Sequence, residues 1–345
     1  MKIPHSRPYI DKKDIKSVVI ALKSRCLSQG KKVKELENFL KDFYGVRGAV
    51  CVSSGTAALH LSLLSLGVSA GDSVLLPSFM CSAPLNAVKY LNAEPVFFDI
   101  AKEISPSPED AEKRKKENTK AIILPHLFGL AADIDEFLKL KIPIIEDCAH
   151  SIGCHYKGRL TGTFGRVSIL SFYATKMIAG GEGGAILSND VDLIEKIKDL
   201  RDYDEKENYK IRFNYKMTDI QASLILSQFK KLKRFISRRK EIAKRYSEIL
   251  LEKGLKPPMS LPFREHIYFR YIVLTDKKEE LLRYLNERGI VARQPVYKPL
   301  HLYFENEKLE VTEEIYKKAV SIPLYPSLTC KEVSYIAKVL REFTY

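Results

Sequence analysis

A lysine beside a glycine-rich loop is the residue of this chain best placed to do chemistry. Lys176 closes the segment SFYATK at 171–176, and the loop GGEGG follows at 180–184. Most lysines are solvated surface groups, but this one lies between an apolar segment and a loop that offers it little solvent. A lysine amine in a desolvated site next to a cationic cofactor becomes nucleophilic enough to form an imine. The glycines allow the backbone to approach a flat ring closely.

A carboxylate follows another apolar segment directly. Asp147 comes after Ile144, Ile145 and Glu146, which predicts a position at the carboxyl edge of a sheet, where open α/β proteins bind their ligands. A carboxylate there can pair with a protonated pyridine nitrogen and keep a cofactor electron-withdrawing. The alternative is an aspartate that only caps a turn. His150 can face the phenolic oxygen of such a cofactor, or it can be a structural hydrogen-bonding group.

A third segment has the composition of an anion site. The residues SSGTAAL at 53–59 form a turn of small residues that opens a helix. Free backbone amides and the helix dipole attract a phosphate to such a turn, and Thr56 adds a hydroxyl. The predicted phosphate contacts are Gly55, Thr56 and Ala57, together with Ser171. The alternative is an ordinary helix N-cap, because serine and threonine are common there.

Hydrophobic spacing predicts the elements that position these groups. Short apolar strands alternate with amphipathic helices through the first two-thirds of the chain, which is typical of an α/β fold with a mostly parallel sheet and helices on both faces. The predicted strands are 49–52, 73–76, 95–98, 121–124, 143–145, 167–172 and 185–187. The predicted helices are 12–24, 32–43, 56–66, 83–91 and 134–140.

A smaller α+β unit is predicted to follow. A long helical pattern runs from 217 to 252, and Pro257, Pro258 and Pro262 then interrupt the chain. Beyond them we expect strands at 268–274 and 290–293, and helices at 278–288 and 331–343. We place the domain boundary near residue 236, which gives a large domain of residues 1–236 and a small domain of residues 237–345.

Composition narrows the classes of partner. Lys and Arg outnumber Asp and Glu by 57 to 43, which gives a net charge of +14. An acidic partner is one interpretation, but the densest basic runs resemble solvated helix surface, and no nucleic-acid-binding motif accompanies them. We therefore expect neither a nucleic-acid partner nor, without an apolar run of about 18 residues, a membrane span. We also expect no signal peptide, because the first residues lack the apolar stretch that is typical of one.

The cysteines indicate reduced thiols rather than a metal site or a disulfide framework. They show no CxxC motif and no ligand-like clustering, so a cytoplasmic protein without a bound metal is predicted. The six are Cys26, Cys51, Cys81, Cys148, Cys154 and Cys330.

In their order along the chain, these segments resemble the DegT–StrS family of sugar aminotransferases, which are fold-type I pyridoxal-phosphate enzymes. The resemblance runs from LSQG at 27–30 to IPLYP at 322–326. Between them it includes SGTAAL at 54–59, PSF at 77–79, HLFG at 126–129, EDCAH at 146–150, the segment ending in Lys176, EGG at 182–184, NYKM at 214–217, QA at 221–222 and YKPLH at 297–301.

The resemblance implies a role for each residue. Lys176 would hold pyridoxal 5′-phosphate as a Schiff base and carry the proton, while Asp147 and His150 would contact the pyridine nitrogen and the phenolic oxygen. Asn214 would reach the phosphate of a neighbouring subunit's cofactor, so a homodimer with shared active sites is expected. The usual reaction moves an amino group from glutamate to a keto-sugar attached to a nucleotide.

Two aspects of the resemblance leave alternatives open. Many relatives have an aromatic ring on the cofactor face where this chain has Cys81; either Cys81 or Phe79, which shares its strand parity, packs on the ring. Lys216 stands where arginine is commoner.

Candidate substrate contacts are Glu182, Arg293, Lys298 and His301. The loop 293–301 and the segment 212–216 offer cations for a pyrophosphate.

Three other functions are alternatives to a sugar aminotransferase. A related pyridoxal-phosphate sugar dehydratase would have histidine at the position of Lys176. A different fold-type I activity, such as a desulfurase or aldolase, would not explain the segments at 214–217 and 297–301. A non-catalytic cofactor-binding regulator would use the net positive charge to contact nucleic acid.

Overall fold

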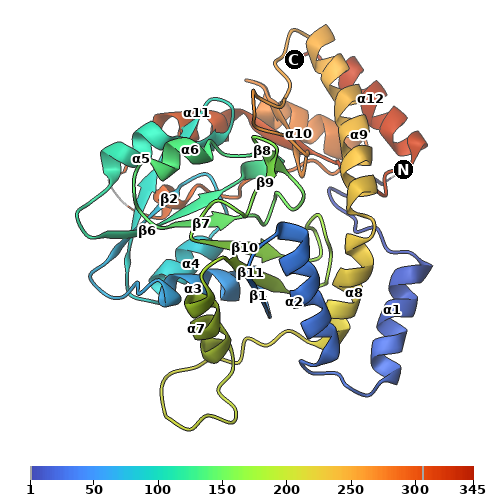
Figure 1. Ribbon diagram of the computed structural model, residues 1–345. Helices are drawn as coiled ribbons and strands as arrows, with labels where there is room; N and C mark the ends of the chain where they lie inside the picture. The colour runs from blue at the N-terminus through green and yellow to red at the C-terminus, as the bar shows by residue number, and fades with distance from the viewer. Residues whose placement is uncertain (1, 305–306) are drawn as a thin grey trace.

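The computed structural model describes residues 2–304 and 307–345 and is built around a seven-stranded sheet (Figure 1). The strands lie in the order β1-β11-β10-β7-β6-β2-β3. β11 is antiparallel to both of its neighbours, whereas the other six strands run parallel to one another. The strands are β1 Gly48–Val52, β2 Ser73–Pro77, β3 Glu94–Phe98, β6 Thr119–Pro125, β7 Ile144–Asp147, β10 Val167–Ser171 and β11 Gly184–Ser188. The predicted strands and the mostly parallel sheet are confirmed.

Helices cover both faces of this sheet because its strands are apolar on both sides. In β1, Ala49 and Cys51 enter the core beneath α2 and α8, while Val50 and Val52 enter the core beneath α3 and α7. Alternation of this kind is the period-two pattern of a strand that is buried on both faces. The helices of this part are α1 Lys12–Lys23, α2 Lys31–Tyr44, α3 Gly55–Ser65, α4 Ala83–Lys89, α5 Pro108–Arg114, α6 Ile134–Leu138, α7 Val191–Arg201 and α8 Asp219–Phe229.

Several short elements lie in the loops that connect the strands of the large sheet. They comprise the two-stranded pairs β4 Ile100–Ala101 with β5 Ser105–Pro106 and β8 His155–Tyr156 with β9 Arg159–Leu160, and the 3-10 turn η1 Leu127–Gly129.

The C-terminal part has its own apolar cluster beneath α9, α10 and α12. Its elements are α9 Leu232–Glu252, β12 Tyr271–Leu274, α10 Lys278–Glu287, η2 Leu300–Tyr303, α11 Glu310–Lys318, β13 Ala319–Ile322 and α12 Cys330–Glu342. The predicted boundary at residue 236 falls inside α9, so this helix would belong to both parts. The division into residues 1–236 and 237–345 stays a prediction.

One predicted strand is wrong. Residues 290–293 form only isolated bridges, from Ile290 to Ile3 and from Arg293 to Ser321. The partner of β12 is instead β13, antiparallel to it, which the sequence analysis did not identify. Ile290 and Ala292 are buried all the same, because this segment lies under the N-terminal segment that carries Ile3.

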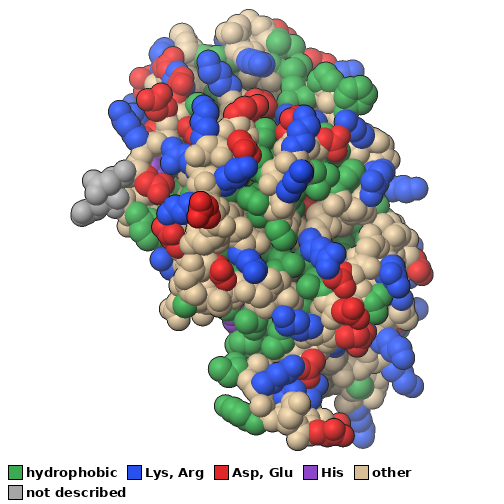
Figure 2. Space-filling view, turned by 60° about the vertical axis from the view of Figure 1, so that its left-hand side comes forward, with side chains coloured by type: hydrophobic (Ala, Val, Ile, Leu, Met, Phe, Trp, Pro, Cys, Tyr) green, Lys and Arg blue, Asp and Glu red, His purple; other side chains and the backbone are tan. Residues whose placement is uncertain are grey.

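Charges of both signs are mixed over the surface. Figure 2 shows Lys and Arg side chains interspersed with Asp and Glu side chains on the face that it presents. Several surface lysines pair within their own helix or turn, such as Lys139 with Glu136 and Lys198 with Glu195, each at 2.6 Å. This mixing favours a solvated surface as the explanation of the net charge of +14. Within the described ranges, no helix has the length and apolarity to cross a membrane.

The start of α2 depends on a carboxylate from a distant helix. Gly30, the N-cap of α2, has no side chain to cap the helix, and Asp219 at the start of α8 takes that role. Its carboxylate accepts bonds from the amides of Gly30 (2.9 Å), Lys32 (3.1 Å) and Val33 (3.0 Å). Because Asp219 is buried, water does not reach these amides to accept their hydrogen bonds in place of the carboxylate.

Asp219→Ala is therefore expected to lower the free energy of unfolding by at least about 2 kcal/mol, because three amides lose a charged acceptor. Urea denaturation of the two proteins measures the difference. Asp192→Ala is the matched control, since Asp192 is exposed in the first turn of α7 and should change stability by less than about 0.5 kcal/mol. Equal effects of the two substitutions would contradict the capping role.

Candidate active site

The predicted site segments meet at one edge of the large sheet. Six parallel strands end at the same edge, so the residues that follow β1, β2, β7 and β10 are neighbours there. Asp147 is the last residue of β7, and Lys176 lies in the turn after β10. The helix α3 starts directly after β1 at Gly55.

Lys176 and Asp147 lie close enough to influence each other's charge. Burial lowers the pKa of the Lys176 amine, Cys81 and Asp147 oppose that shift, and Arg270 adds to it. Burial raises the pKa of the Asp147 carboxyl, while the amide of Ala149 and the charge of Lys176 act in the opposite direction. Asp147 Oδ1 accepts the Ala149 N–H at 2.9 Å. Its Oδ2 accepts no bond from the described residues, so it is the oxygen that suits a cationic N–H partner.

The His150 imidazole lies between two aromatic rings and is neutral. Its ring stacks on Phe269, with centroids 4.3 Å apart, and more loosely on Phe128 at 5.8 Å. Burial, assisted by Lys176 and Arg270, holds the pKa of His150 well below its usual value. Since Nδ1 accepts the amide of Phe128 at 3.4 Å, the neutral ring carries its proton on Nε2. His150 can therefore donate from Nε2 to an oxygen in the site.

Phe269 joins the site from the C-terminal part of the chain. Its buried ring lies 5.4 Å from Lys176 Nζ and 5.0 Å from the guanidinium carbon of Arg270. Both residues fall in the strand predicted at 268–274, and neither was predicted to have a role in the site. A cationic residue within an otherwise apolar strand, as in YFRYIVL at 268–274, is the signal that could have identified Arg270.

The start of α3 and the end of β10 form the candidate phosphate seat. Ser54 caps α3 by accepting the amide of Ala57 at 3.0 Å, while the first amides of the helix have no intrahelical acceptor. Ser171 faces this turn, because a Cβ added to Gly55 would lie 3.2 Å from its Oγ. A hollow of about 400 Å³ opens beside the seat and is lined in part by Thr56 and Ala57.

Cys81 and Phe79 occupy different environments. Phe79 is fully buried and packs edge-on against Phe128, with centroids 6.1 Å apart. Cys81 is exposed and acts on the pKa of Lys176. This geometry favours Cys81 as the residue that faces a cofactor ring.

The residues between α7 and α8 divide into exposed and ion-paired groups. Asn214 is exposed, and the carbonyl of the next residue accepts the amide of Ser53 at 2.8 Å, beside the phosphate seat. Arg212 pairs with Asp199 at 3.0 Å, and Lys216 pairs with two aspartates, so neither is free for a substrate pyrophosphate.

Glu182 in the glycine-rich loop is exposed, and its backbone carbonyl accepts a hydrogen bond from the Gln221 side chain.

The other predicted substrate contacts differ in their access to the site. Arg293 is exposed and lies near Arg270, whose pKa it lowers. The Lys298 ammonium lies 4.4 Å from the ring centroid of Tyr303. His301 is completely buried and shares a 2.6 Å hydrogen bond with Ser78. Its position does not support the prediction of a direct substrate contact, because its imidazole holds the loop to the end of β2.

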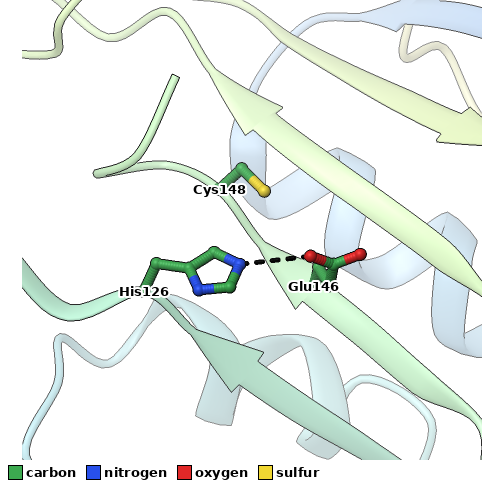
Figure 3. A group of neighbouring side chains, drawn as sticks. All are labelled: His126, Glu146 and Cys148. Atoms are coloured by element: carbon green, nitrogen blue, oxygen red, sulfur yellow. Dashed lines mark hydrogen bonds and ion pairs between the residues drawn. The ribbon is translucent and has the colours of Figure 1, made fainter. Parts of the chain in front are cut away.

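A buried trio beneath the site has the donor types of a metal centre (Figure 3). Ligand atoms of His126, Glu146 and Cys148 lie within 4.8 Å of one another. His126 Nδ1 accepts the amide of Ala132 at 3.0 Å, so its Nε2 carries the proton that bonds to Glu146 Oε2 at 3.2 Å. Burial raises the pKa of the Cys148 thiol. A metal would have to displace these bonds and the thiol proton, so we interpret His126 and Glu146 as part of a hydrogen-bonded network, with the Cys148 thiol beside it.

Glu146 is the centre of that network. It also accepts the amides of Gly162 (2.7 Å), Phe164 (2.7 Å) and Gly165 (2.6 Å). Burial acts to raise the pKa of the Glu146 carboxyl, but these bonds and the one from His126 outweigh it and hold the pKa below its usual value. These bonds hold the end of β7 at Glu146, directly before Asp147, to the turn at 162–165.

Comparisons with known proteins agree with this geometry. The model of the DegT/DnrJ/EryC1/StrS aminotransferase family matches residues 8–341. GDP-perosamine synthase of Escherichia coli O157:H7 is 34% identical over 364 residues, covering 99% of this chain and 98% of that protein. The aminotransferase TlmJ from Streptoalloteichus hindustanus has a TM-score of 0.93 at 28% identity, with 99% and 98% of the two chains covered. The PLP form of Spr1654 from Streptococcus pneumoniae has a TM-score of 0.92 at 27% identity, with the same coverage.

Glu146→Gln is expected to lower the free energy of unfolding by about 2–4 kcal/mol at neutral pH, because an amide cannot accept four bonds as a carboxylate does. The folded-state pKa of Glu146 is lowered, so its contribution is fully present above the usual glutamate pKa and is lost as the pH falls through the folded value. Urea denaturation at several pH values should show the difference between parent and variant narrowing only in acid. The exposed Glu117→Gln is the control; a difference independent of pH would contradict an ionised Glu146.

Proposed function

Because the chain belongs to the DegT/DnrJ/EryC1/StrS aminotransferase family and is a pyridoxal-phosphate-dependent sugar aminotransferase, we propose that it moves an amino group from L-glutamate to a keto-sugar carried by a nucleotide. The observation that carries the proposal is the coupled pair of Lys176 and Asp147 at the carboxyl edge of the sheet. The relative named GDP-perosamine synthase matches over nearly its whole length, which supports a nucleotide-linked substrate.

The residues present fit the cofactor. The spare oxygen of Asp147 would accept the pyridine N–H, and the Nε2 proton of His150 would be donated to the phenolic oxygen. The first turn of α3, with Thr56 and Ser171, would hold the phosphate. Cys81 would lie against the face of the ring. Bound pyridoxal phosphate supplies the electron sink that stabilises negative charge at the carbon exchanging its amino group.

Lys176 would have a second task as a carrier of protons. An amine whose pKa is lowered by burial is neutral for a larger share of the time, so it can take a proton from the reacting carbon and return it. The Ala149 amide fixes one oxygen of Asp147, which would keep the other oxygen in place for the pyridine nitrogen.

Lys176→Ala is expected to lose nearly all turnover, although the phosphate seat can still hold the cofactor without a covalent bond. The parent protein should be yellow, and glutamate should shift its absorbance towards the pyridoxamine form. Lys139→Ala, which removes an exposed ion-paired lysine, is the control and should behave as the parent. Turnover of Lys176→Ala close to that of the parent, or a parent that stays colourless with added cofactor, would refute the assignment.

We propose further that the enzyme is a homodimer in which Asn214 reaches the phosphate of the partner's cofactor. The segment between α7 and α8 projects from the body of the subunit (Figure 1). It exposes apolar side chains, with Tyr209 96% and Ile211 70% accessible, and apolar side chains at the end of a projecting segment favour contact with another protein surface. Family resemblance supplies the expectation that this surface belongs to a second copy.

Hybrid dimers test that proposal. Asn214→Asp should bind cofactor poorly because it places a negative charge beside the phosphate, and Lys176→Ala should be inactive. A hybrid of the two would contain one site with both changes and one with neither, so about half of the parent activity should return. Each variant alone is the control. If Asn214 serves its own subunit, every site in the hybrid is damaged and no activity returns.

Two proposals remain, one for the residues that contact the substrate and one for the cellular compartment. Glu182 and Lys298 are proposed to contact the sugar nucleotide, since Glu182 is exposed and Lys298 is partly so. A cytoplasmic location is proposed because all six cysteines are free, which fits a reducing compartment.

A further inference from the structure

Two arginines near Lys176 lack a carboxylate partner. Arg270 follows Phe269 into β12, and Arg293 lies beside β13, where its backbone exchanges bonds of 3.0 and 2.7 Å with Ser321. Burial, with the charge of Arg293, lowers the pKa of Arg270 to about 10, so the guanidinium stays cationic at neutral pH. In the described part of the chain, neither arginine takes part in an ion pair, unlike Arg201, Arg212 or Arg264. Two neighbouring cations without a counter-charge favour an anionic ligand.

His5 orients Arg270 without neutralising it. Arg270 Nη1 donates to His5 Nδ1 at 3.1 Å, and His5 Nε2 donates to the Ser321 hydroxyl at 2.9 Å. Burial, Arg270 and Arg293 together lower the pKa of His5 to about 3, so the ring is neutral and can accept from the guanidinium. A bond at one edge of the guanidinium leaves its other donors for a ligand.

Arg270 lies within reach of a group held at Lys176. The Phe269 ring is 5.4 Å from Lys176 Nζ and 5.0 Å from the Arg270 guanidinium carbon, so these two atoms are at most about 10 Å apart. An amino donor attached through its nitrogen carries its carboxylates a few bonds away from that nitrogen. A guanidinium within that distance can be reached by a carboxylate of an amino acid held through its nitrogen.

We infer that Arg270, oriented by His5 and assisted by Arg293, binds a carboxylate of the amino donor. The inference rests on the proposed function and names the contact that would select an acidic donor. Arg270 is partly buried, which suits a terminal carboxylate; a pyrophosphate is flanked by sugar and nucleoside and needs room on both sides. Arg293, which the sequence analysis assigned to the pyrophosphate, is reassigned to the carboxylate because it adjoins Arg270.

Arg270→Gln tests the inference on the intact holoenzyme. Calorimetry with glutarate, a dicarboxylate that has no amino group and cannot react, should show a Kd at least about tenfold higher than in the parent, because a charge-assisted contact is lost. The KM for glutamate should rise by a similar factor, while the KM for the sugar nucleotide changes less than about twofold. Arg270→Lys keeps the charge and should recover part of the glutarate affinity. Arg288→Gln, at an exposed arginine after α10, is the matched control.

The outcomes separate the inference from the proposed function. If the parent reacts with glutamate but Arg270→Gln binds glutarate as the parent does, the inference is wrong and the function stands. A rise in the KM for the sugar nucleotide alone would assign the arginines to the pyrophosphate and would also overturn it. Failure of the parent to convert glutamate would refute the proposed donor, whereas loss of glutarate binding in Arg270→Gln would still support the carboxylate site. If Arg270→Gln does not fold, Arg293→Gln provides the same comparison with a smaller expected loss.

Discussion

A buried carboxylate that must be fully hydrogen-bonded fixes the edge of the sheet on which the site is built. An isolated charge in the protein interior is strongly unfavourable, so Glu146 is stable there only with its donors in place. Those donors come from His126 at the end of β6 and from the turn at 162–165 that leads into β10. The ends of β6 and β7 and the start of β10 are thereby held together, and Asp147 is the next residue along the chain.

The glycine-rich loop closes the site from the other side. β11 is antiparallel, so the loop at 180–184 must return the chain to the edge where β10 ended. A side chain at Gly184 would overlap the Ser54 carbonyl, and Gly183 adopts a φ of 139°, which side chains rarely tolerate. The close approach keeps the Lys176 turn beside the start of α3. An antiparallel strand in an otherwise parallel sheet therefore brings an amine and a phosphate seat together.

The sequence predicts those features that depend on residues close to one another along the chain. The strands of the large sheet are short apolar runs with turns at their ends, and Lys176 and Asp147 stand out by what flanks them. The strand predicted at 290–293 failed because burial beneath Ile3, rather than pairing in a ladder, explains its apolar residues. The roles of Phe269 and His5 could not be assigned from the sequence, since Phe269 meets Lys176 and His5 meets Arg270 only through contacts between distant parts of the chain. His301 reads as a polar loop residue, but the fold buries it against Ser78.

The balance of charge around Lys176 explains why such a site would take anionic partners. Arg270 and Arg293 are cations, and Asp147 is the carboxylate that acts on Lys176. His5 and His150 have their pKa values lowered by burial and by these same cations, so they donate and accept hydrogen bonds without adding charge. An empty cluster of this kind is electrostatically unfavourable, and a bound phosphate or carboxylate relieves it. The distant surface lysines are paired or solvated, so the proposed selection of an anionic ligand would come from this local excess of positive charge rather than from the net charge of the chain.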